Sequence, residues 1–199
     1  MWGAATEEKR DALRAAALSR RNSLSKANFL LWSRLIQAKA LELPRYLTSR
    51  TVALYSPVQN EVATDEILQQ ALRARRKVFY PKIGPENAVE FVQIFSAADL
   101  AAGRFGTLEP TGLSRLSEGD SEDLVVFVPG VVFDLSGNRL GRGKGWYDRM
   151  LSRLGNKGVF VGLAYEFQIV DRVPTEAWDQ KVRYLVTEER VIDCGITSS

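Results

Sequence analysis

The sequence predicts an α/β fold with a mainly parallel sheet, on the strength of three observations. Short apolar segments of strand length alternate along the 199 residues with segments of helical periodicity. Hydrophobic residues make up 45% of the chain, enough for a core without disulfides or structural metals. Neither internal repeats nor a low-complexity tract divides the chain. We therefore expect a single domain over residues 1–199.

Two helices are predicted near the N-terminus, in a basic helical segment of about residues 6–43. Thr6 is a candidate N-cap, and the acidic residues after it suit the positive end of a helix dipole. A helical apolar stripe continues to Ser25, a second candidate N-cap, and Pro44 ends the second helix. Residues 9–50 hold ten Lys/Arg and two acids, a local charge of +8 (10 − 2). Such a segment suits either an anionic partner or a solvated helix face.

Six apolar segments then predict strands. They span residues 51–56, 77–83, 89–94, 124–128, 158–164 and 184–187. Further helices are expected over residues 64–75 and 146–154, and a turn over residues 84–87. Residues 111–123 are polar and predict a flexible loop.

The composition excludes several kinds of site. The chain has no histidine, which rules out histidine triads, histidine metal ligands and imidazole bases. Cys194 is the only cysteine, so an internal disulfide is impossible and a reducing compartment is favoured. The sequence contains no run of about 18 apolar residues, so it predicts no membrane-spanning helix, and the N-terminal residues lack an apolar signal core. We expect a cytoplasmic protein without a membrane partner.

The most informative stretch is rich in glycine and lies before a predicted helix. Gly141, Gly143 and Gly145 alternate with Arg142 and Lys144. Glycine permits positive φ and close backbone approach, and N–H groups at a helix N-terminus suit phosphate oxygens. The two cations would strengthen such a site. The spacing is neither a Walker A loop nor a Rossmann fingerprint, and a basic surface turn is the alternative reading.

Two carboxylates are candidates for chemistry on the basis of their positions. Glu61 follows a predicted strand end, where sites form in α/β sheets, although an ordinary loop carboxylate would look the same. Asp148 lies just inside the helix that follows the glycines. It would serve either as a partner of the helix dipole or as a Mg²⁺ ligand beside nucleotide phosphates.

One long motif joins these features. It runs Pro129-Gly130-x-x-Phe133-Asp134-x-x-Gly137-x-Arg139-Leu140-Gly141-x-Gly143-x-Gly145-x-Tyr147-Asp148. This motif resembles the signature of the 5-formyltetrahydrofolate cyclo-ligase family. Segments at residues 10–14, 53–64, 108–110 and 174–188 also resemble the family, in the same order. The resemblance therefore covers nearly the whole chain.

The resemblance implies a ligase on a three-layer α/β/α fold, similar to the sugar-phosphate isomerase and CoA-transferase group. Its substrates would be ATP and 5-formyltetrahydrofolate, its cofactor Mg²⁺ and its product 5,10-methenyltetrahydrofolate. The γ-phosphoryl group would pass to the formyl oxygen, and N10 would then close the ring. Arginine, lysine, Mg²⁺ and backbone N–H groups suffice for this chemistry without histidine. The resemblance implies no nucleic-acid partner and no obligate protein partner.

The resemblance also implies roles for particular residues. ATP would be bound by Arg10, Arg14, Arg139, Leu140, Gly141, Arg142, Gly143, Lys144, Gly145, Trp146 and Tyr147. Arg142 and Lys144 would act in catalysis. The folate would be bordered by Ser56, Glu61 and Trp146, and Mg²⁺ held by Asp148 and Asp179. Arg10 stands where the family usually has lysine and Trp146 where it often has tyrosine, so charge and stacking are kept while the geometry and a hydroxyl change.

Two other functions stay open on the sequence. A cyclo-ligase-like paralogue could share the fold and have a different role, although Arg14, Glu61, Lys144 and Asp148 favour a working enzyme. Nucleic-acid binding through the basic segment is the second alternative. No RNA-binding aromatic motif or helix-turn-helix pattern supports it.

Overall fold

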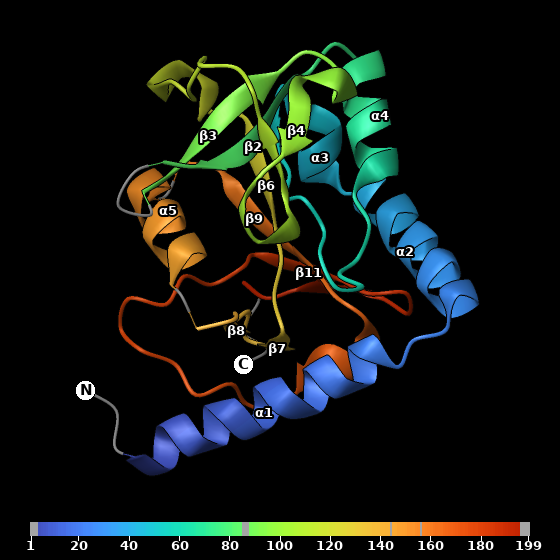
Figure 1. The fold of residues 1–199 in the computed structure, drawn as a ribbon, viewed down its shortest axis with the longest axis vertical. Helices are drawn as coiled ribbons and strands as arrows, with labels where there is room; N and C mark the ends of the chain where they lie inside the picture. The colour runs from blue at the N-terminus through green and yellow to red at the C-terminus, as the bar shows by residue number, and fades with distance from the viewer. Residues whose placement is uncertain (1–3, 85–87, 144, 156, 196–199) are drawn as a thin grey trace.

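The computed structural model describes residues 4–84, 88–143, 145–155 and 157–195 (Figure 1). Its helices are α1 (Ala4–Asn22), α2 (Lys26–Leu41), α3 (Pro44–Thr48), α4 (Asp65–Arg73) and α5 (Trp146–Leu154). Among them, none is long and apolar enough to cross a membrane.

A seven-stranded sheet forms the centre of the molecule, in the order β12-β11-β9-β6-β1-β2-β3. Its strands are β1 (Thr51–Ala53), β2 (Lys77–Ile83), β3 (Val89–Ile94), β6 (Leu124–Val128), β9 (Val159–Leu163), β11 (Tyr184–Val186) and β12 (Val191–Asp193). The five central strands run parallel, and an antiparallel strand flanks them at each edge. The prediction of a mainly parallel sheet is confirmed.

Helices cover both faces of this sheet, because its strands send alternate side chains to opposite sides. Val52 and Val125 pack under α2, α3 and α4 in one apolar cluster. Ala53 and Val126, one residue further along each strand, pack under α5 in another. Strands buried on both faces explain the continuous apolar segments of the sequence. The layers therefore follow the α/β/α order that was expected.

Two small sheets lie beside the large one. The first contains β7 (Val132–Asp134), β8 (Arg139–Leu140) and β10 (Ile169–Val170), and the second contains β4 (Leu100–Ala102) and β5 (Leu108–Pro110). The helix α1 packs on the first through Leu13, Ala17 and Leu18, below β7 and β8 in Figure 1. The basic N-terminal helix therefore lies beside the glycine-rich segment and not on the central sheet.

The local signals for helix ends were only partly correct. Ser25 is confirmed as the N-cap of α2, since its hydroxyl accepts a backbone N–H at 3.1 Å. Thr6 lies inside α1, so its prediction as a cap was wrong. Thr64 precedes α4, but its hydroxyl donates to the carbonyl of Tyr55 at 3.1 Å and makes no cap bond. Pro44 follows the end of α2 and also begins α3, where its missing N–H costs nothing.

The strand β2 contains Pro81, which a central strand would normally exclude. Its pairing with β1 covers only residues 77–79, whereas its pairing with β3 extends to Ile83. Beyond Phe79, β2 is therefore an edge strand on the β1 side. The proline N, which cannot donate, faces a position where no ladder bond is needed.

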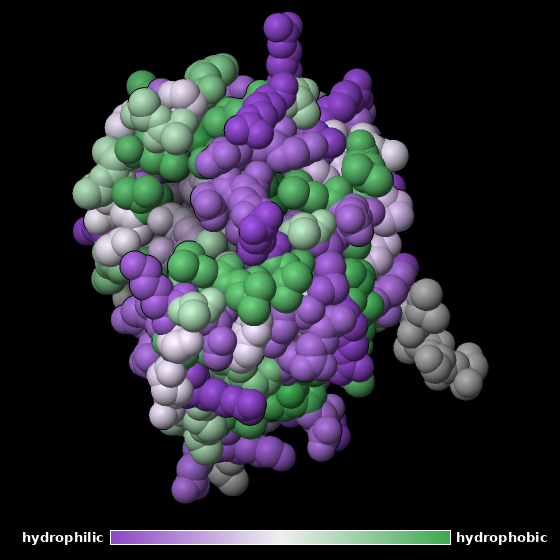
Figure 2. All heavy atoms as spheres, turned by 90° about the vertical axis from the view of Figure 1, so that its right-hand side faces the viewer, coloured by the Kyte–Doolittle hydropathy of each residue, from purple (hydrophilic) through white to green (hydrophobic). Residues whose placement is uncertain are grey.

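The surface on the side of α2 and α4 is mixed in character. Figure 2 shows hydrophobic and hydrophilic residues interspersed over this side. The exposed leucines Leu30, Leu31 and Leu35 belong to α2.

The polar segment 111–123 packs along the edge of the sheet. The amide of Leu116 donates to the carbonyl of Phe91 on β3 at 3.0 Å. Asp120 accepts from the ammonium of Lys77 at 2.6 Å, from the hydroxyl of Ser117 at 2.5 Å and from the amide of Ser117 at 2.9 Å. These hydrogen bonds, that from Lys77 first, lower the pKa of Asp120 from 3.8 to about 2. One carboxylate thus joins the segment to the start of β2.

We predict that Asp120→Asn lowers the melting temperature at pH 7 but not near pH 2. A depressed pKa in the folded state stabilises the fold above the ordinary value of 3.8, and the stabilisation is lost as the pH falls towards about 2. Thermal unfolding followed by circular dichroism across this range measures the effect. Glu118→Gln, an exposed change in the same turn, is the control and should alter Tm little at either pH. An equal deficit at both pH values would contradict the prediction.

Candidate active site

A pocket of about 800 Å³ opens at the carboxyl ends of the parallel strands. Ser56 follows β1, Pro129 follows β6 and Ile83 ends β2, and all three line the pocket. Ligands of α/β sheets bind at this edge, because there the loops after parallel strands converge. The pocket is therefore where the fold itself would place a site.

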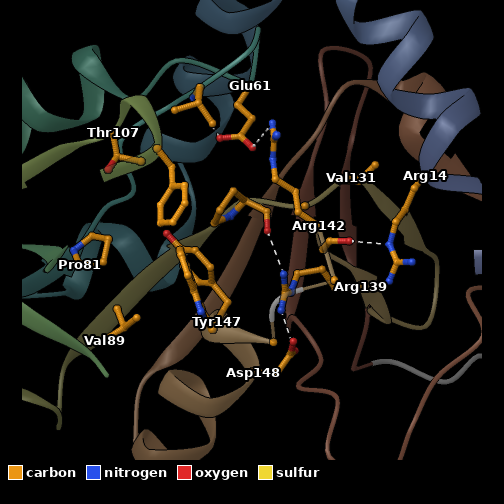
Figure 3. Close-up of a pocket in the computed structure, with 18 of the residues that line it drawn as sticks. Arg14, Glu61, Pro81, Val89, Thr107, Val131, Arg139, Arg142, Tyr147 and Asp148 are labelled. Carbon is orange, nitrogen blue, oxygen red and sulfur yellow. Dashed lines mark hydrogen bonds and ion pairs between the residues drawn. The ribbon is translucent and has the colours of Figure 1, made fainter. Parts of the chain in front are cut away.

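The two sides of the pocket differ in character (Figure 3). Arg14, Arg139 and Arg142 lie on one side, on α1 and the glycine-rich segment. Pro81 and Val89, from the β2–β3 hairpin, lie on the other. One side therefore suits an anion and the other a flat apolar group.

The glycine-rich segment contributes backbone as well as side chains. Gly141, Gly143 and Gly145 line the pocket. Gly143 has φ of 88° and Gly145 has φ of 60°, values that favour glycine over residues with a Cβ. Gly145 is also the N-cap of α5, so the start of that helix faces the pocket. Lys144 lies outside the described residues.

Two arginines hold the carboxylates that were predicted to bind metal. Arg139 is 3% exposed, and its Nη2 donates to Asp148 Oδ1 at 2.6 Å. Arg10 Nη1 lies 3.5 Å from Asp179 Oδ2. Asp148 also accepts a long bond from the amide of Gln180 at 3.4 Å, next to Asp179 in the chain. The two aspartates therefore line one pocket, as expected, and each is paired with an arginine.

Two further arginines link the glycine-rich segment to its neighbours. Arg14 Nε donates to the carbonyl of Gly141 at 3.1 Å, which ties α1 to the segment. Arg142 Nη1 donates to Gln59 Oε1 at 2.6 Å, and its Nη2 lies 3.6 Å from Glu61 Oε1. The loop after β1 and the glycine-rich segment are thus connected across the pocket (Figure 3).

Glu61 is buried at the wall of the pocket. Its Oε2 accepts from the amide of Val58 at 3.1 Å, and its Oε1 lies 3.6 Å from both Arg21 and Arg142. Burial raises the pKa of Glu61 above its ordinary value, and Arg21, the Val58 amide and Arg142 offset that rise only in part. Burial therefore disfavours the ionised form of this carboxyl, and two neighbouring cations favour it.

The hairpin of β4 and β5 forms another part of the wall. The hydroxyl of Ser56 accepts from the amide of Leu108 at 2.7 Å, which fixes the hairpin to the end of β1. Phe105 and Thr107 line the pocket from this hairpin. The ring of Phe105 lies 5.1 Å from that of Trp146, centroid to centroid.

The structure brings together nearly all the residues predicted for the site. Among the described ones, Leu140 alone does not line the pocket, because its side chain is fully buried against Val132 and Val173. The expected contact of Leu140 with the nucleotide is therefore not supported by its position. Sequence reasoning missed Phe105 and Gln59. Phe105 lies close to the 108–110 motif, whereas Gln59 has no local signal.

Comparisons with known proteins agree with this arrangement. The model of the 5-formyltetrahydrofolate cyclo-ligase family matches residues 6–188. A probable 5-formyltetrahydrofolate cyclo-ligase of Schizosaccharomyces pombe is 33% identical over 168 residues, covering 77% of this chain and 82% of that protein. The 5-formyltetrahydrofolate cyclo-ligase of Escherichia coli K12 is 31% identical over 163 residues, covering 77% and 86%.

A solved structure extends the agreement to the fold. The 5,10-methenyltetrahydrofolate synthetase of Aquifex aeolicus superimposes with a TM-score of 0.82 and 38% identity, over 96% of this chain and 95% of that one. The expected family and ligase class are confirmed, whereas the likeness to the sugar-phosphate isomerase and CoA-transferase group stays a prediction. On its sequence, its fold and the contents of its pocket, the chain belongs to the 5-formyltetrahydrofolate cyclo-ligase family.

Proposed function

We propose that this chain uses ATP to convert 5-formyltetrahydrofolate to 5,10-methenyltetrahydrofolate in the pocket described above. Membership of the family supports both the reaction and the use of ATP. One observation carries the proposal: motif residues from four parts of the chain converge on one pocket. These parts are α1, the loop after β1, the glycine-rich segment and the C-terminal segment of residues 174–188. A basic surface turn would not require such a convergence.

The arginine side of the pocket is the proposed site of the ATP phosphates. Arg10, Arg14 and Arg139 present guanidinium groups there, and the glycines allow the backbone to come close. The N-terminus of α5 adds favourable N–H groups. Arg142 and Lys144 are the proposed catalytic cations, the role of Lys144 resting on the motif alone.

The reaction needs a poor electrophile to be activated. Transfer of the γ-phosphoryl to the formyl oxygen gives ADP and an iminium phosphate at N5. N10 then attacks the formyl carbon and loses its proton, and phosphate leaves with the former formyl oxygen. Cations that neutralise the moving phosphoryl, and a pocket that aligns the two substrates, supply the catalysis.

The apolar side of the pocket is the proposed site of the folate rings. Pro81 and Val89 offer apolar contact there. Trp146, which also lines the pocket, offers an aromatic ring for stacking. Glu61 is the buried carboxylate that we assign to recognition of the folate. In its ionised form it accepts hydrogen bonds only, which suits the N–H groups of a reduced pteridine. Ser56 supports this side by holding the β4–β5 hairpin.

Mg²⁺ is the proposed cofactor. The described residues contain no group of three or more His, Cys, Asp or Glu that could hold a metal. Mg²⁺ does not need one, because it commonly takes one or two carboxylates together with phosphate oxygens and water. Asp148 and Asp179, which line one pocket, fit that requirement. Bound there, Mg²⁺ would neutralise charge on the ATP phosphates.

The first prediction from this proposal is the activity itself. Purified protein should form methenyltetrahydrofolate from 5-formyltetrahydrofolate only when ATP and Mg²⁺ are both present. ADP should appear in equal amount, measured by chromatography alongside the absorbance of the product. Product without nucleotide, or no product from folded protein, would reject the proposal.

The second prediction concerns α1. Arg14→Ala should raise KM for ATP about tenfold or more and KM for the folate much less, because the guanidinium faces the phosphate side and supports Gly141. Lys9→Ala is the matched control, since Lys9 is an exposed cation of the same helix outside the pocket. A selective loss of folate affinity in Arg14→Ala would show that the two sides have been assigned wrongly.

The third prediction concerns the two aspartates. Asp148→Asn and Asp179→Asn should each need more Mg²⁺ for half-maximal rate, and excess Mg²⁺ should partly restore activity. Because both would act on one ion, the double variant should be non-additive. Glu176→Gln, which changes another carboxylate of the pocket, is the control and should keep the normal requirement. A normal Mg²⁺ requirement in both aspartate variants would remove support for this metal site.

A further inference from the structure

A further arginine of α1, Arg21, lies behind the pocket. Arg21 is 1% exposed and is among the largest fully buried side chains of the described chain. Its Nη1 donates to the carbonyl of Gly130 at 3.3 Å, and its Nη2 lies 3.6 Å from Glu61 Oε1. Among the described residues, its Nε and Nη2 have no hydrogen-bond partner. A buried cation is costly without a countercharge, and Glu61 is the carboxylate that supplies it.

Arg21 also contacts the loop that presents Glu61. Its main-chain carbonyl accepts from the side-chain amide of Asn60 at 3.3 Å. Gln59 and Asn60 have φ of 48° and 57°, so two consecutive residues lie in the left-handed region, which is strained for residues other than glycine. Such a loop persists only when its surroundings hold it. Arg21 holds it through both its main chain and its side chain.

The groups around Glu61 are not equivalent. Arg21 and Arg142 are its cationic neighbours, and the phenols of Tyr55, Tyr147 and Tyr165 complete the surroundings. The side chain of Arg142 is 36% exposed, so water screens its charge, whereas that of Arg21 is buried. Among the individual interactions that lower the pKa of Glu61 against the effect of burial, the charge of Arg21 is the largest.

We infer that Arg21 is a positioning residue, which keeps the Glu61 carboxylate ionised and directed into the pocket without touching the substrate itself. The inference rests on the proposed function, in which ionised Glu61 accepts hydrogen bonds from the folate. It assigns to α1 two distinct tasks. Arg10 and Arg14 face the phosphate side, while Arg21 acts on the folate side from within the core.

The test compares Arg21→Met, which removes the charge but keeps an extended side chain, with Arg20→Met. Arg20 is the exposed neighbour on the same helix and is the matched control. The measurement is kcat/KM for 5-formyltetrahydrofolate at saturating ATP between pH 6 and pH 9. Without Arg21 the pKa of Glu61 rises, so less of it is ionised at the acidic end. The ratio of kcat/KM at pH 6 to that at pH 8 should fall on the order of tenfold below wild type. Arg20→Met should match wild type.

A merely structural role predicts a different result. If Arg21 only supports packing, Arg21→Met should lower Tm and reduce kcat/KM by the same factor at every pH, which would overturn the inference. Glu61→Gln provides the complementary control, since it has no carboxyl to titrate. In that background Arg21→Met should cause no additional pH-dependent loss.

Two measurements keep the inference testable without turnover. In a carbon NMR titration, the midpoint of the Glu61 side-chain carboxyl signal should lie at a higher pH in Arg21→Met than in the wild type. This result is expected even if the wild type is inactive and the proposed function fails. If Arg21→Met does not fold, the double variant with Glu61→Gln should fold, because it removes both buried charges. An unchanged Glu61 titration in the first case, or an unfolded double variant in the second, would overturn the inference.

Discussion

The pairing of buried arginines with carboxylates is the interaction on which the pocket depends. Arg139 with Asp148 and Arg21 with Glu61 both involve a guanidinium that is almost fully removed from water. Loss of one partner from such a pair typically costs about 3 to 5 kcal/mol, because a buried charge is left uncompensated. The pairs therefore fix the relative positions of the segments that bear them. The carboxylates also offset the mutual repulsion of the arginines that lie close together in the free protein.

These pairs also explain why an N-terminal helix outside the central sheet is part of the site. The helix α1 has its own apolar contacts with the small sheet of β7, β8 and β10, through Leu13, Ala17 and Leu18. Those contacts bring a second set of charges to the carboxyl ends of the parallel strands, where the loop after β1 and the glycine-rich segment already meet. The large sheet provides the edge, and the helix completes the arginine-rich side of the pocket.

The pocket has two chemically different sides because different structural units meet at this edge of the sheet. Beyond the last pairing with β1, β2 continues as a hairpin with β3, and its Pro81 and Val89 supply apolar surface. Polar and apolar groups are thus drawn from different structural units, and Glu61 lies where the two sides meet. An enzyme that joins a nucleotide and a flat, partly apolar substrate needs such an arrangement, because each substrate requires a different surface while their reacting atoms must touch.

The mainly parallel sheet and the bounds of β2, β3, β6 and α5 could be predicted from the sequence, because apolar periodicity is a local property of the chain. Nearly all the site residues implied by the family resemblance also line the pocket, whereas other lining residues, such as Gln59 and Phe105, were not predicted. Caps such as Thr6 were misjudged, since a helix end depends on which competing hydrogen bonds are available. The burial of Leu140 in the core and the approach of Arg21 to Glu61 could be seen only in the folded chain. Whether an arginine of an amphipathic helix is solvated or buried depends on the surface that packs against it. That surface comes from residues about 40 and 110 positions away, and no local pattern reports it.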